Sequence, residues 1–374
     1  MKKKILFITG TRADYGKIKP LINSIYKSKD FQVQILITGM HLLSKYGNTY
    51  TEIEEDFDVK IFKLRNIQKN DGMNQILSRS INQIDAILKK IKPNLIFVHG
   101  DRIEALAGTI CGVFNNYLVA HVEGGDVSGT IDESIRHAIT KFAQIHFVTG
   151  VKQKKRLIQL GENTDNIYVL GLTEKNILLD KALPSLKEVK TRYEIDYSDY
   201  AIMIFHPVTT EQDEITKQIK IIINSIKSSK LNYIIIYPNN DLGSEKIFKI
   251  YEGYKHYKKF RFLPSMRFEY FLTLLKNSNF IIGNSSVGVL QSPIYNLPSI
   301  NLGTRQNNRN NNKNIIQSKI EEKLITKYIN SIKKIKNKSN NKSLSNTKYI
   351  NYFKNILSSK KIWKTNVQKH FLDL

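Results

Sequence analysis

The stretch HVEGGDVSGTIDESIR, residues 121–136, carries the clearest signal of the fold. It begins at the end of the apolar run LVAHV, which is typical of a buried parallel strand, and it continues through a glycine-rich loop into a helix near Asp132. Glu123 therefore follows a strand, and Asp101 holds the matching place one strand earlier, at the end of NLIFVHGD. Because ligands of open α/β sheets bind outside the carboxyl ends of the strands, we expect these acids to border one crevice. Carboxylates that converge on a crevice are suited to proton transfer.

Strands and helices alternate along the rest of the first half. The apolar runs of this half predict strands at KKILFIT (3–9), QVQILIT (32–38), FDVKIFKL (57–64), NLIFVH (94–99), QIHFV (144–148) and NIYVL (166–170). A helix is predicted over 73–91, where apolar residues recur at helical spacing, and further helices are predicted over 105–113, from Asp132 and over 152–160. The polar segment 180–200 is expected to be a linker.

A second alternating series follows this linker. Strands are predicted at 200–207, 232–238, 260–264, 280–286 and 298–303, with helices at 211–226, 266–278 and 286–296. From Asn307 onward we expect helices and no chemistry. The alternation predicts an α/β protein of two Rossmann-like halves with parallel sheets, and an active site in the cleft between the halves.

Composition limits the class of protein. A chain of 374 residues favours two domains, and 41% hydrophobic with 24% charged residues is typical of a soluble globular protein. The opening MKKKILFITG is interpreted as a first strand and not a signal peptide, because Arg12 and Asp14 follow at once. The single cysteine, Cys111, excludes an internal disulfide and favours a reducing, cytoplasmic location. The apolar runs are too short to span a membrane, so no membrane partner is expected.

The formal charge of +25 admits two interpretations. It is compatible with binding to nucleic acid, or it reflects a compositional bias toward Lys, Asn and Ile on every exposed face. The basic residues lack the clustering of a binding stripe, so we favour the bias and expect no nucleic-acid partner. The charge would still attract a phosphorylated small molecule.

Candidate anion-binding groups occur in both halves. The loop GTRADYGK carries Arg12 and Lys17 before a helix, and it matches neither a Walker A loop nor a dinucleotide fingerprint. In the second half, His206 ends a strand, and Arg305 follows the last predicted strand. The GNSS loop places Ser285 and Ser286 before a helix, where they either bind phosphate or cap the helix.

Other chemistry finds no support in the motifs. Asp132 is either a third acid or a helix cap, and His99, His121 and His137 are interpreted as packing or supporting groups. The sequence has no CxxC, no HExxH and no clustered His/Cys set, so no metal is expected. It has no G-x-S-x-G elbow, which argues against a serine hydrolase.

Taken together, the motifs resemble the hydrolysing UDP-N-acetylglucosamine 2-epimerases, in the branch that makes N-acetylmannosamine for bacterial sialic acid synthesis. The resemblance covers nearly the whole chain and rests on GTRADYGKIKPL, TGMHLLSKYGNTY, HGDRIEALAG, HVEGGDVSGTIDESIRH, FHPVTTE, YPNNDLGSE, RFEYFLTLLK, GNSSVGVLQSP, INLGTRQNNR and the terminal WKTNVQKHFLDL.

This resemblance implies a glycosyltransferase-B-like fold. Its expected parts are an N-terminal Rossmann-like domain with the catalytic acids (1–172), a C-terminal nucleotide-binding domain (173–350) and a C-terminal helix (351–374) that packs back on the first domain. It also implies a UDP-sugar substrate, no cofactor, no metal and a homo-oligomer, expected to be a dimer.

The resemblance implies roles residue by residue. Asp101, Glu123 and Asp132 would be the catalytic acids, with His206 and Arg136 holding charge near the leaving pyrophosphate. Arg12 and Lys17 would bind substrate phosphate or sugar. Ser285, Ser286 and Arg305 would hold the nucleotide diphosphate, Phe271 would stack on uracil, and Gln291 would lie near the ribose.

The implied reaction has two steps. Removal of the sugar C2 proton with anti-elimination of UDP gives a 2-acetamidoglucal, and addition of water with a proton to the opposite face of C2 gives N-acetylmannosamine. A weakly acidic C2 proton needs both a base and a stabilised leaving group, which fits carboxylates combined with cations. The assignment of each carboxylate to a step stays open at this point.

Two departures from the family's pattern affect the substrate. Gln291 stands where the family usually has a glutamate, and GLTEKN (171–176) replaces the usual turn. The nearest alternative substrate is therefore a UDP-2,4-diacetamido-trideoxy-hexose of legionaminic acid synthesis. A glycosyltransferase on the same fold is a further alternative, and a non-enzymatic nucleic-acid binder is supported by the charge alone.

Overall fold

The computed structural model of the chain describes residues 2–69, 71–179, 183–332 and 348–373. The chain forms two compact units. The first comprises Met1–Asp126, Ile131–Asn176 and Ser345–Leu374, and the second comprises Val127–Thr130 and Ile177–Leu344. Each unit is built on a parallel sheet with helices around it, which confirms the predicted fold class.

The sheet of the first unit has seven strands in the order β3-β2-β1-β4-β5-β6-β7. These strands are β1 (Lys3–Thr9), β2 (Phe31–Ile37), β3 (Lys60–Lys63), β4 (Leu95–His99), β5 (Leu118–Val122), β6 (Ile145–Val148) and β7 (Ile167–Val169), all paired in parallel. The order reverses between β1 and β4, and such a switch point opens a crevice at the carboxyl ends of the strands. Strands β4 and β5 are buried along their whole length, which is why they are continuous apolar runs.

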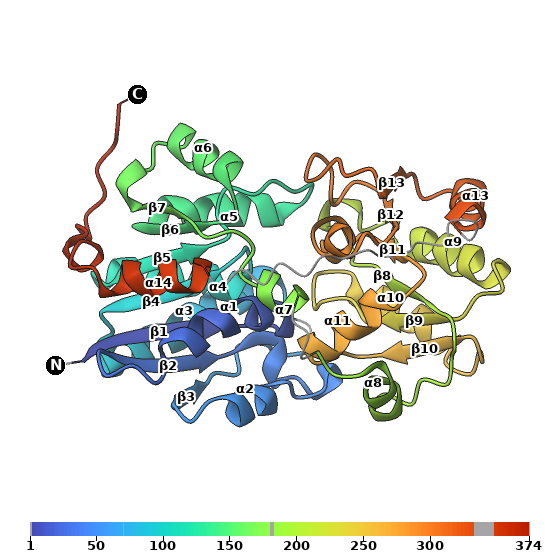
Figure 1. Cartoon of the computed structure of the whole chain (residues 1–374), viewed down its shortest axis with the longest axis horizontal. Coiled ribbons are helices and arrows are strands. Elements are labelled where there is room, and N and C mark those ends of the chain that lie inside the picture. The colour runs from blue at the N-terminus through green and yellow to red at the C-terminus, as the bar shows by residue number, and fades with distance from the viewer. Residues whose placement is uncertain (1, 70, 180–182, 333–347, 374) are drawn as a thin grey trace. The chain divides into compact units, whose positions relative to one another are not determined.

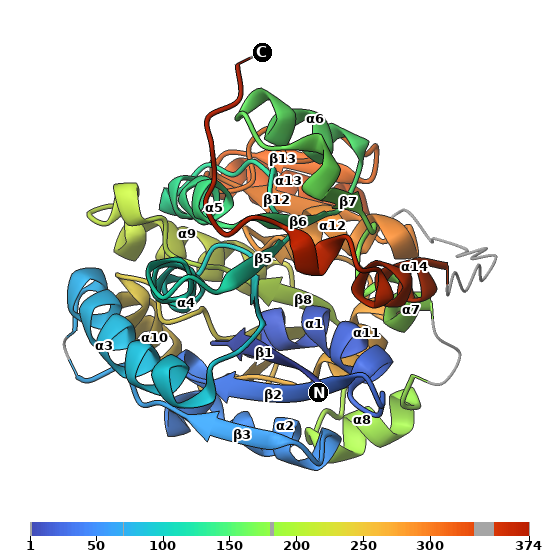
Figure 2. The same ribbon diagram turned by 90° about the vertical axis from the view of Figure 1, so that its left-hand side faces the viewer.

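Helices cover both faces of this sheet (Figures 1 and 2). Helix α1 (Arg12–Ile25) and helix α14 (Lys348–Ser358) pack on one face, and α3 (Met73–Ile91), α4 (Ile103–Phe114) and α5 (Ile131–Phe142) pack on the other. Helix α3 has the bounds that its apolar stripe predicts. The unit also contains α2 (Tyr50–Asp56) and α6 (Val151–Gln159), whereas α7 (Lys175–Leu179) begins in this unit and continues into the second.

The C-terminal segment differs from the predicted helix over 351–374. Helix α14 begins at Lys348 and ends at Ser358, and a single 3-10 turn follows at Ile362–Lys364. Phe353 anchors α14, with its ring 5.7 Å from Phe97 and 5.4 Å from Phe147. Beyond residue 364 the apolar side chains of Val367, Phe371 and Leu372 are exposed, so a helix there would bury no apolar face. Polar contacts to the rest of the first unit hold this segment instead, including a 2.9 Å hydrogen bond from Gln144 Nε2 to the Val367 carbonyl. The prediction of a terminal helix through residue 374 is therefore wrong.

The sheet of the second unit has six parallel strands in the order β10-β9-β8-β11-β12-β13. They are β8 (Ala201–Ile204), β9 (Tyr233–Ile236), β10 (Phe260–Leu263), β11 (Ile281–Gly283), β12 (Ser299–Leu302) and β13 (Ile315–Ser318). The helices around it are α8 (Leu186–Arg192), α9 (Ile215–Ser228), α10 (Ser244–Glu252), α11 (Phe268–Lys276), α12 (Val287–Leu290) and α13 (Glu322–Ile332). This arrangement confirms the predicted second Rossmann-like half.

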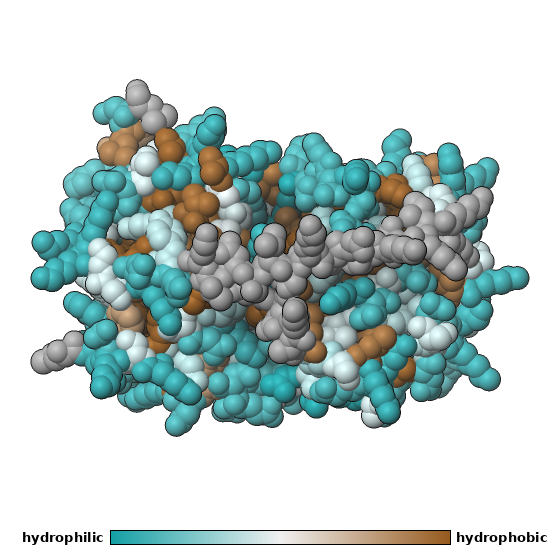
Figure 3. Space-filling view, viewed as in Figure 1, coloured by the Kyte–Doolittle hydropathy of each residue, from teal (hydrophilic) through white to brown (hydrophobic). Residues whose placement is uncertain are grey.

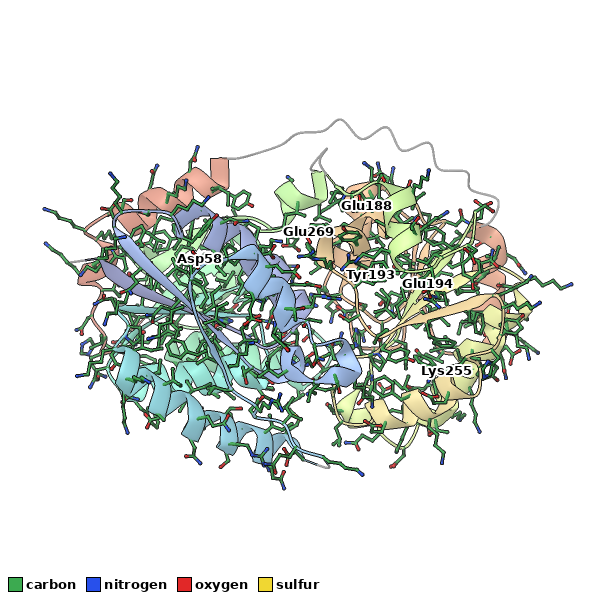
Figure 4. The ribbon with its side chains drawn as sticks, turned by 90° about the horizontal axis from the view of Figure 1, so that it is seen from below. Asp58, Glu188, Tyr193, Glu194, Lys255 and Glu269 are labelled. Atoms are coloured by element: carbon green, nitrogen blue, oxygen red, sulfur yellow. The ribbon has the colours of Figure 1, made fainter. Side chains whose placement is uncertain are left out.

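The segment 180–200 is not the linker that its polarity suggests. Its described part contains α8, whose N-cap Ser185 accepts a hydrogen bond from the Glu188 amide and whose Val189 is fully buried. The hydroxyl of Tyr270 on α11 donates to Glu188 at 2.7 Å. Figure 4 labels Glu188, Tyr193 and Glu194 along α8 and the turn after it, with Glu269 of α11 nearby. Residues 180–182 lie outside the described part of the chain.

Three further boundaries in the second unit correct the sequence interpretation. Helix α9 begins at Ile215 instead of residue 211, because a 3-10 turn occupies Thr209–Glu211. The predicted helix 286–296 divides into α12 and a 3-10 turn at Ser292–Tyr295, where Pro293 lacks an amide donor. Strand β13 occurs in the region expected to form helices only, and its partial burial at the sheet edge explains its weak apolar signal.

The surface drawn in Figure 3 is mostly hydrophilic, with hydrophobic side chains scattered over it. Among the residues that the structure describes, no helix combines the length and the apolar character needed to cross a bilayer.

Candidate active site

Glu123 is a buried carboxylate at the carboxyl end of β5. Its backbone φ is +67°, in the left-handed region, and the residue is 4% exposed. Lys17 Nζ lies 2.7 Å from Glu123 Oε2, and His99 Nε2 lies 3.4 Å from the same oxygen. The other oxygen, Oε1, is buried and has no hydrogen-bond partner among the described residues. One oxygen of the carboxylate is therefore held, and the other is an unsatisfied buried acceptor among the described residues.

The charge state of Glu123 follows from these neighbours. Burial alone would raise the pKa of this carboxyl, but the Coulombic attraction of Lys17 and then of His99 outweighs it. The pKa of Glu123 is therefore held well below the usual range for glutamate, so the group is ionised at neutral pH. An ionised buried carboxylate with one unpaired oxygen is equipped to accept a proton.

The loop before Lys17 is fixed by Asp14 of the GTRADYGK motif. Helix α1 opens with a capping box in which Thr11 is the N-cap and Asp14 is the reciprocal partner. The Thr9 hydroxyl donates to Asp14 Oδ1 at 2.6 Å, and the Gly10 amide donates to Oδ2 at 3.0 Å. Since these groups are buried, the loop presents α1 in a defined orientation, and Lys17 reaches Glu123 across 106 residues of sequence.

Arg12 is engaged within the first unit. Its guanidinium pairs with both carboxylate oxygens of Glu52 on α2, with 3.1 Å between Arg12 Nε and Glu52 Oε2. Its predicted contact with substrate phosphate or sugar stays a prediction.

Arg136 is a buried cation that pairs with Asp101 and interacts electrostatically with two further acids. The residue is 2% exposed, and its Nη1 donates to the Asp126 carbonyl at 2.9 Å while Nη2 pairs with the Asp101 carboxylate. Burial alone would lower the pKa of Arg136, but Asp101 and Asp126, with a smaller contribution from Asp132 in the first turn of α5, raise it above its ordinary value. Arg136 thus pairs with Asp101, and the charge of Asp132 acts on the same guanidinium.

Asp101 and Glu123 follow the carboxyl ends of two neighbouring strands of the sheet. Strands β4 and β5 are parallel neighbours, with His99 in register with Val122, so the residues that follow them leave the sheet side by side. This is the placement that the strand-end rule predicts for these acids.

In the second unit, His206 has a defined tautomer. Its Nδ1 accepts a hydrogen bond from the Asn239 amide at 3.1 Å, so a neutral ring carries its proton on Nε2. Asn284 holds the His206 backbone on both sides, because its Oδ1 accepts from the His206 amide at 2.7 Å and its Nδ2 donates to the His206 carbonyl at 2.8 Å. His206 is therefore presented as a fixed donor at the end of β8.

The GNSS loop and Arg305 form one group with Asn284. Arg305 Nη1 and Gln306 Nε2 lie 3.4 Å and 2.9 Å from the Asn284 carbonyl. Ser285 is 8% exposed and Ser286 precedes α12 as its N-cap, without a side-chain capping bond. These neighbours place hydroxyls, amides and a guanidinium close together, which suits an anion.

Two predicted nucleotide-binding residues are deeply buried. Gln291 is 2% exposed at the end of α12. Phe271 is 8% exposed and belongs to the hydrophobic core of the second unit with Leu272, Leu275 and Tyr295. Most of the Phe271 ring therefore packs in the core, and its stacking on uracil stays a prediction.

Several residues of the candidate sites in the two units are not singled out by the sequence pattern. His99, interpreted as a packing or supporting group, contacts Glu123, and its position two residues before Asp101 at a strand end was a usable signal. Asn284 lies inside the recognised GNSS motif but was not singled out. Glu52 had no signal in the sequence, because its partner Arg12 lies 40 residues away. Asp126 lies only ten residues before Arg136, but it contacts Arg136 through its backbone carbonyl, which the residue type does not signal. Within the described part of the chain, no His, Cys, Asp and Glu side chains gather as a set able to hold a metal ion.

Comparison with known proteins adds an independent line of evidence. The profile of the UDP-N-acetylglucosamine 2-epimerase family matches residues 23–365. The chain is 42% identical over 307 residues to a UDP-N-acetylglucosamine 2-epimerase of Neisseria meningitidis serogroup B, a match that covers 82% of this chain and 81% of that protein. It is 32% identical over 314 residues to the hydrolysing UDP-N,N'-diacetylbacillosamine 2-epimerase of Legionella pneumophila (83% of each chain). It is also 32% identical over 314 residues to polysialic acid biosynthesis protein P7 of Escherichia coli (82% and 80%).

Solved structures agree on the fold. A UDP-GlcNAc 2-epimerase from Neisseria meningitidis bound to UDP-GlcNAc matches with a TM-score of 0.75 at 17% identity, covering 95% of this chain and all of that one (100%). One from Methanocaldococcus jannaschii, in complex with UDP-GlcNAc and UDP, matches with a TM-score of 0.76 at 22% identity (95% and 99%). The two parallel-sheet units thus form the expected glycosyltransferase-B-like fold. From the family profile and these identities, the chain belongs to the UDP-N-acetylglucosamine 2-epimerase family.

Proposed function

We propose that the protein is a hydrolysing 2-epimerase that converts UDP-N-acetylglucosamine to N-acetylmannosamine and UDP, for the synthesis of sialic acid or a related surface glycan. The single observation that carries this proposal is Glu123, a buried, ionised carboxylate. One of its oxygens is held by Lys17 and His99, and the other has no hydrogen-bond partner among the residues that the structure describes. The name of the meningococcal relative supports the substrate, and the names of the Legionella and Escherichia coli relatives support the hydrolytic outcome and the pathway.

In the first step Glu123 accepts the C2 proton. The C2–H bond breaks, its electron pair forms the C1–C2 double bond, and the C1–O bond to the diphosphate breaks, so that UDP leaves with the bonding pair. Because its pKa is low, Glu123 is ionised at neutral pH and can take up a proton. Within the described part of the chain, Oε1 is the carboxylate oxygen without a protein partner. His206, donating from Nε2, and the group around Arg305 stabilise the departing phosphates.

In the second step water adds to the glycal. Its oxygen bonds to C1, and a proton is delivered to C2 on the face opposite the one from which the first was removed. Asp101, which pairs with Arg136, and Asp132, whose charge acts on the same guanidinium, are the acids proposed for this half of the reaction. Arg12 completes the sugar or phosphate contacts, Ser285 and Ser286 bind the diphosphate, Gln291 contacts the ribose and Phe271 contacts the uracil. The enzyme is proposed to act in the cytoplasm as a dimer, without metal or cofactor.

Incubation with UDP-N-acetylglucosamine in heavy water tests the proposal. We expect UDP and N-acetylmannosamine carrying deuterium at C2, identified by NMR. The Glu123→Gln variant should lose at least about a thousandfold in kcat while it keeps its affinity for UDP, because the base is removed and the nucleotide contacts are not. Product without deuterium, or near-wild-type turnover by Glu123→Gln, would refute the elimination route.

One alternative substrate has specific support. The 32% identity to the Legionella enzyme, whose name specifies UDP-N,N'-diacetylbacillosamine, favours a 2,4-diacetamido sugar as the second candidate. Parallel measurements of kcat/KM on the two UDP-sugars decide between them. A glycosyltransferase needs an acceptor, so release of UDP and a free sugar without acceptor excludes that class.

A further inference from the structure

The C-terminal segment that follows α14 contacts the first unit through Lys369. The Lys369 ammonium donates to the Ala143 carbonyl at 2.8 Å and to the Thr140 carbonyl at 3.2 Å, and it pairs with the Glu162 carboxylate. The side chain of Lys369 is 25% exposed and that of Glu162 is 1% exposed. This is a largely buried charge contact, made by residues beyond the 3-10 turn at Ile362–Lys364, where the described chain forms no helix or strand.

Lys369 acts as a cap on α5. The carbonyls of Thr140 and Ala143 lie at the C-terminal end of that helix, where the last carbonyls lack intrahelical donors and carry partial negative charge. A cation at this end satisfies them and favours the helix. Glu162 holds the cation in place: burial would raise its pKa, but His146 at 2.9 Å and Lys369 lower it to about 2. Glu162 is therefore ionised throughout the physiological range.

His121 links the last turn of α5 to the strand ends that Asp101 and Glu123 follow. This ring is fully buried, and burial lowers its pKa to about 3, so it is neutral. His121 Nε2 lies 2.8 Å from the Gly100 carbonyl, which can only accept, so Nε2 carries the proton. Nδ1 must then accept from the Thr140 hydroxyl, 3.0 Å away. The direction of every hydrogen bond in this link is thus determined.

Gly100, Thr140 and His121 all contact backbone next to the candidate catalytic acids. Gly100 immediately precedes Asp101, and its amide donates to the Val122 carbonyl, one residue before Glu123. Gly124 packs so closely that a Cβ there would lie 3.0 Å from Thr140 Oγ1 and 3.1 Å from His121 Nδ1. Asp132 lies in the first turn of α5, and Arg136 lies one turn further along the same helix.

We propose that the C-terminal segment, through Lys369, positions the catalytic edge of the first unit: it caps α5 and, through Thr140 and His121, fixes the backbone around Asp101 and Glu123. Lys369 is a positioning residue and does not touch substrate. The inference rests on the proposed function for its kinetic consequences, and on the geometry alone for its structural ones. Chemistry that needs carboxylates placed to within a fraction of an ångström is sensitive to such support.

The test compares Lys369→Met with Lys364→Met, a matched substitution of an exposed lysine in the same segment. We expect kcat of Lys369→Met on UDP-N-acetylglucosamine to fall at least tenfold, with KM and the dissociation constant for UDP within twofold of wild type, and Lys364→Met to be unchanged. A fall smaller than twofold, or a parallel loss of UDP affinity, overturns the positioning role.

A second variant and a second readout separate this inference from the proposed function. Thr140→Val removes the donor to His121 without altering the C-terminal segment, and it should reproduce the fall in kcat even if Lys369→Met folds poorly. Hydrogen exchange needs no activity: amides of α5 and of residues 100–102 should exchange faster in Lys369→Met than in Lys364→Met. Unchanged exchange there overturns the inference, whereas faster exchange in a chain inactive on the UDP-sugar refutes only the proposed function.

Discussion

Replacing Lys17 with methionine measures what the buried ion pair does for Glu123. The two charges are 2.7 Å apart, and the side chains are 11% and 5% exposed. At an effective dielectric constant of about 20, their attraction is roughly 6 kcal/mol, of which desolvation offsets a large part. Removing one partner leaves a buried charge without its main compensation, which costs about 3–5 kcal/mol. We therefore expect Lys17→Met to lose about 3 kcal/mol or more of unfolding free energy at pH 8.

The stability deficit of Lys17→Met should depend on pH. In the wild type the pKa of Glu123 lies well below its usual range, so the stabilisation from the pair is present above that range and is lost as the pH falls. In Lys17→Met burial is opposed mainly by His99, so the carboxyl protonates more readily and its penalty is relieved in acid. The stability deficit should be smaller at pH 5 than at pH 8, and the acid limb of the kcat/KM profile should move to higher pH.

Urea unfolding followed by circular dichroism at both pH values checks these magnitudes, with the Lys17→Met/Glu123→Gln double variant as the control. Without the carboxylate, no uncompensated charge remains, so the double variant should recover much of the deficit at pH 8 and show little difference between the two pH values. A deficit below about 1 kcal/mol, an equal deficit at pH 5 and pH 8, or no recovery in the double variant would refute the role given to Lys17.

The second unit yields two more expected outcomes. Asn284→Ala leaves the His206 amide and carbonyl without their side-chain partners, which should cost about 1–3 kcal/mol of unfolding free energy. Because His206 is then no longer fixed, calorimetry should show UDP binding weakened by about tenfold or more. Gly283→Ala should give no folded protein, because φ is +133° and a Cβ would lie 1.9 Å from the Ile204 carbonyl oxygen. The matched Gly47→Ala, with φ +86° and nothing within 4 Å, should cost only about 1–2 kcal/mol in thermal unfolding.

The sequence predicts elements well where packing imposes a period. Helix α3 has the predicted bounds because its buried residues Ile76, Ile84, Leu88 and Ile91 form one apolar stripe. The sequence pattern does not reveal helix α8, because Val189 is the one residue of that helix that is buried, so no apolar stripe appears. Strand β13 was missed because an edge strand with partly exposed side chains has no strong alternation. In both, tertiary contacts supply what local pattern does not.

In the site, too, features set by local sequence are predictable, and contacts between residues distant in sequence are not. That Asp101 and Glu123 follow adjacent strands was predictable, because register and direction of neighbouring parallel strands fix where their ends lie. The counter-ions were not predictable. Lys17 and Arg136 were assigned to substrate by motif, whereas the fold pairs them with Glu123 and with Asp101, over 106 and 35 residues of sequence. Pairing at that distance depends on helix placement, and sequence patterning does not report it.

The backbone of Glu123 offers a test of why a carboxylate stands there. A φ of +67° costs a residue with a Cβ about 1–2 kcal/mol relative to glycine, and burial adds a desolvation penalty. At an ordinary site alanine is more stable than glycine, because glycine loses more chain entropy on folding. Here the order should invert: Glu123→Gly should be more stable than Glu123→Ala by about 1 kcal/mol, since both lack the carboxylate and both leave Lys17 without it. If alanine proves the more stable by thermal unfolding, the backbone at Glu123 is not strained. If glycine does, the chain sustains a strained backbone in order to place an ionised acid at the end of β5, as sites built for chemistry do.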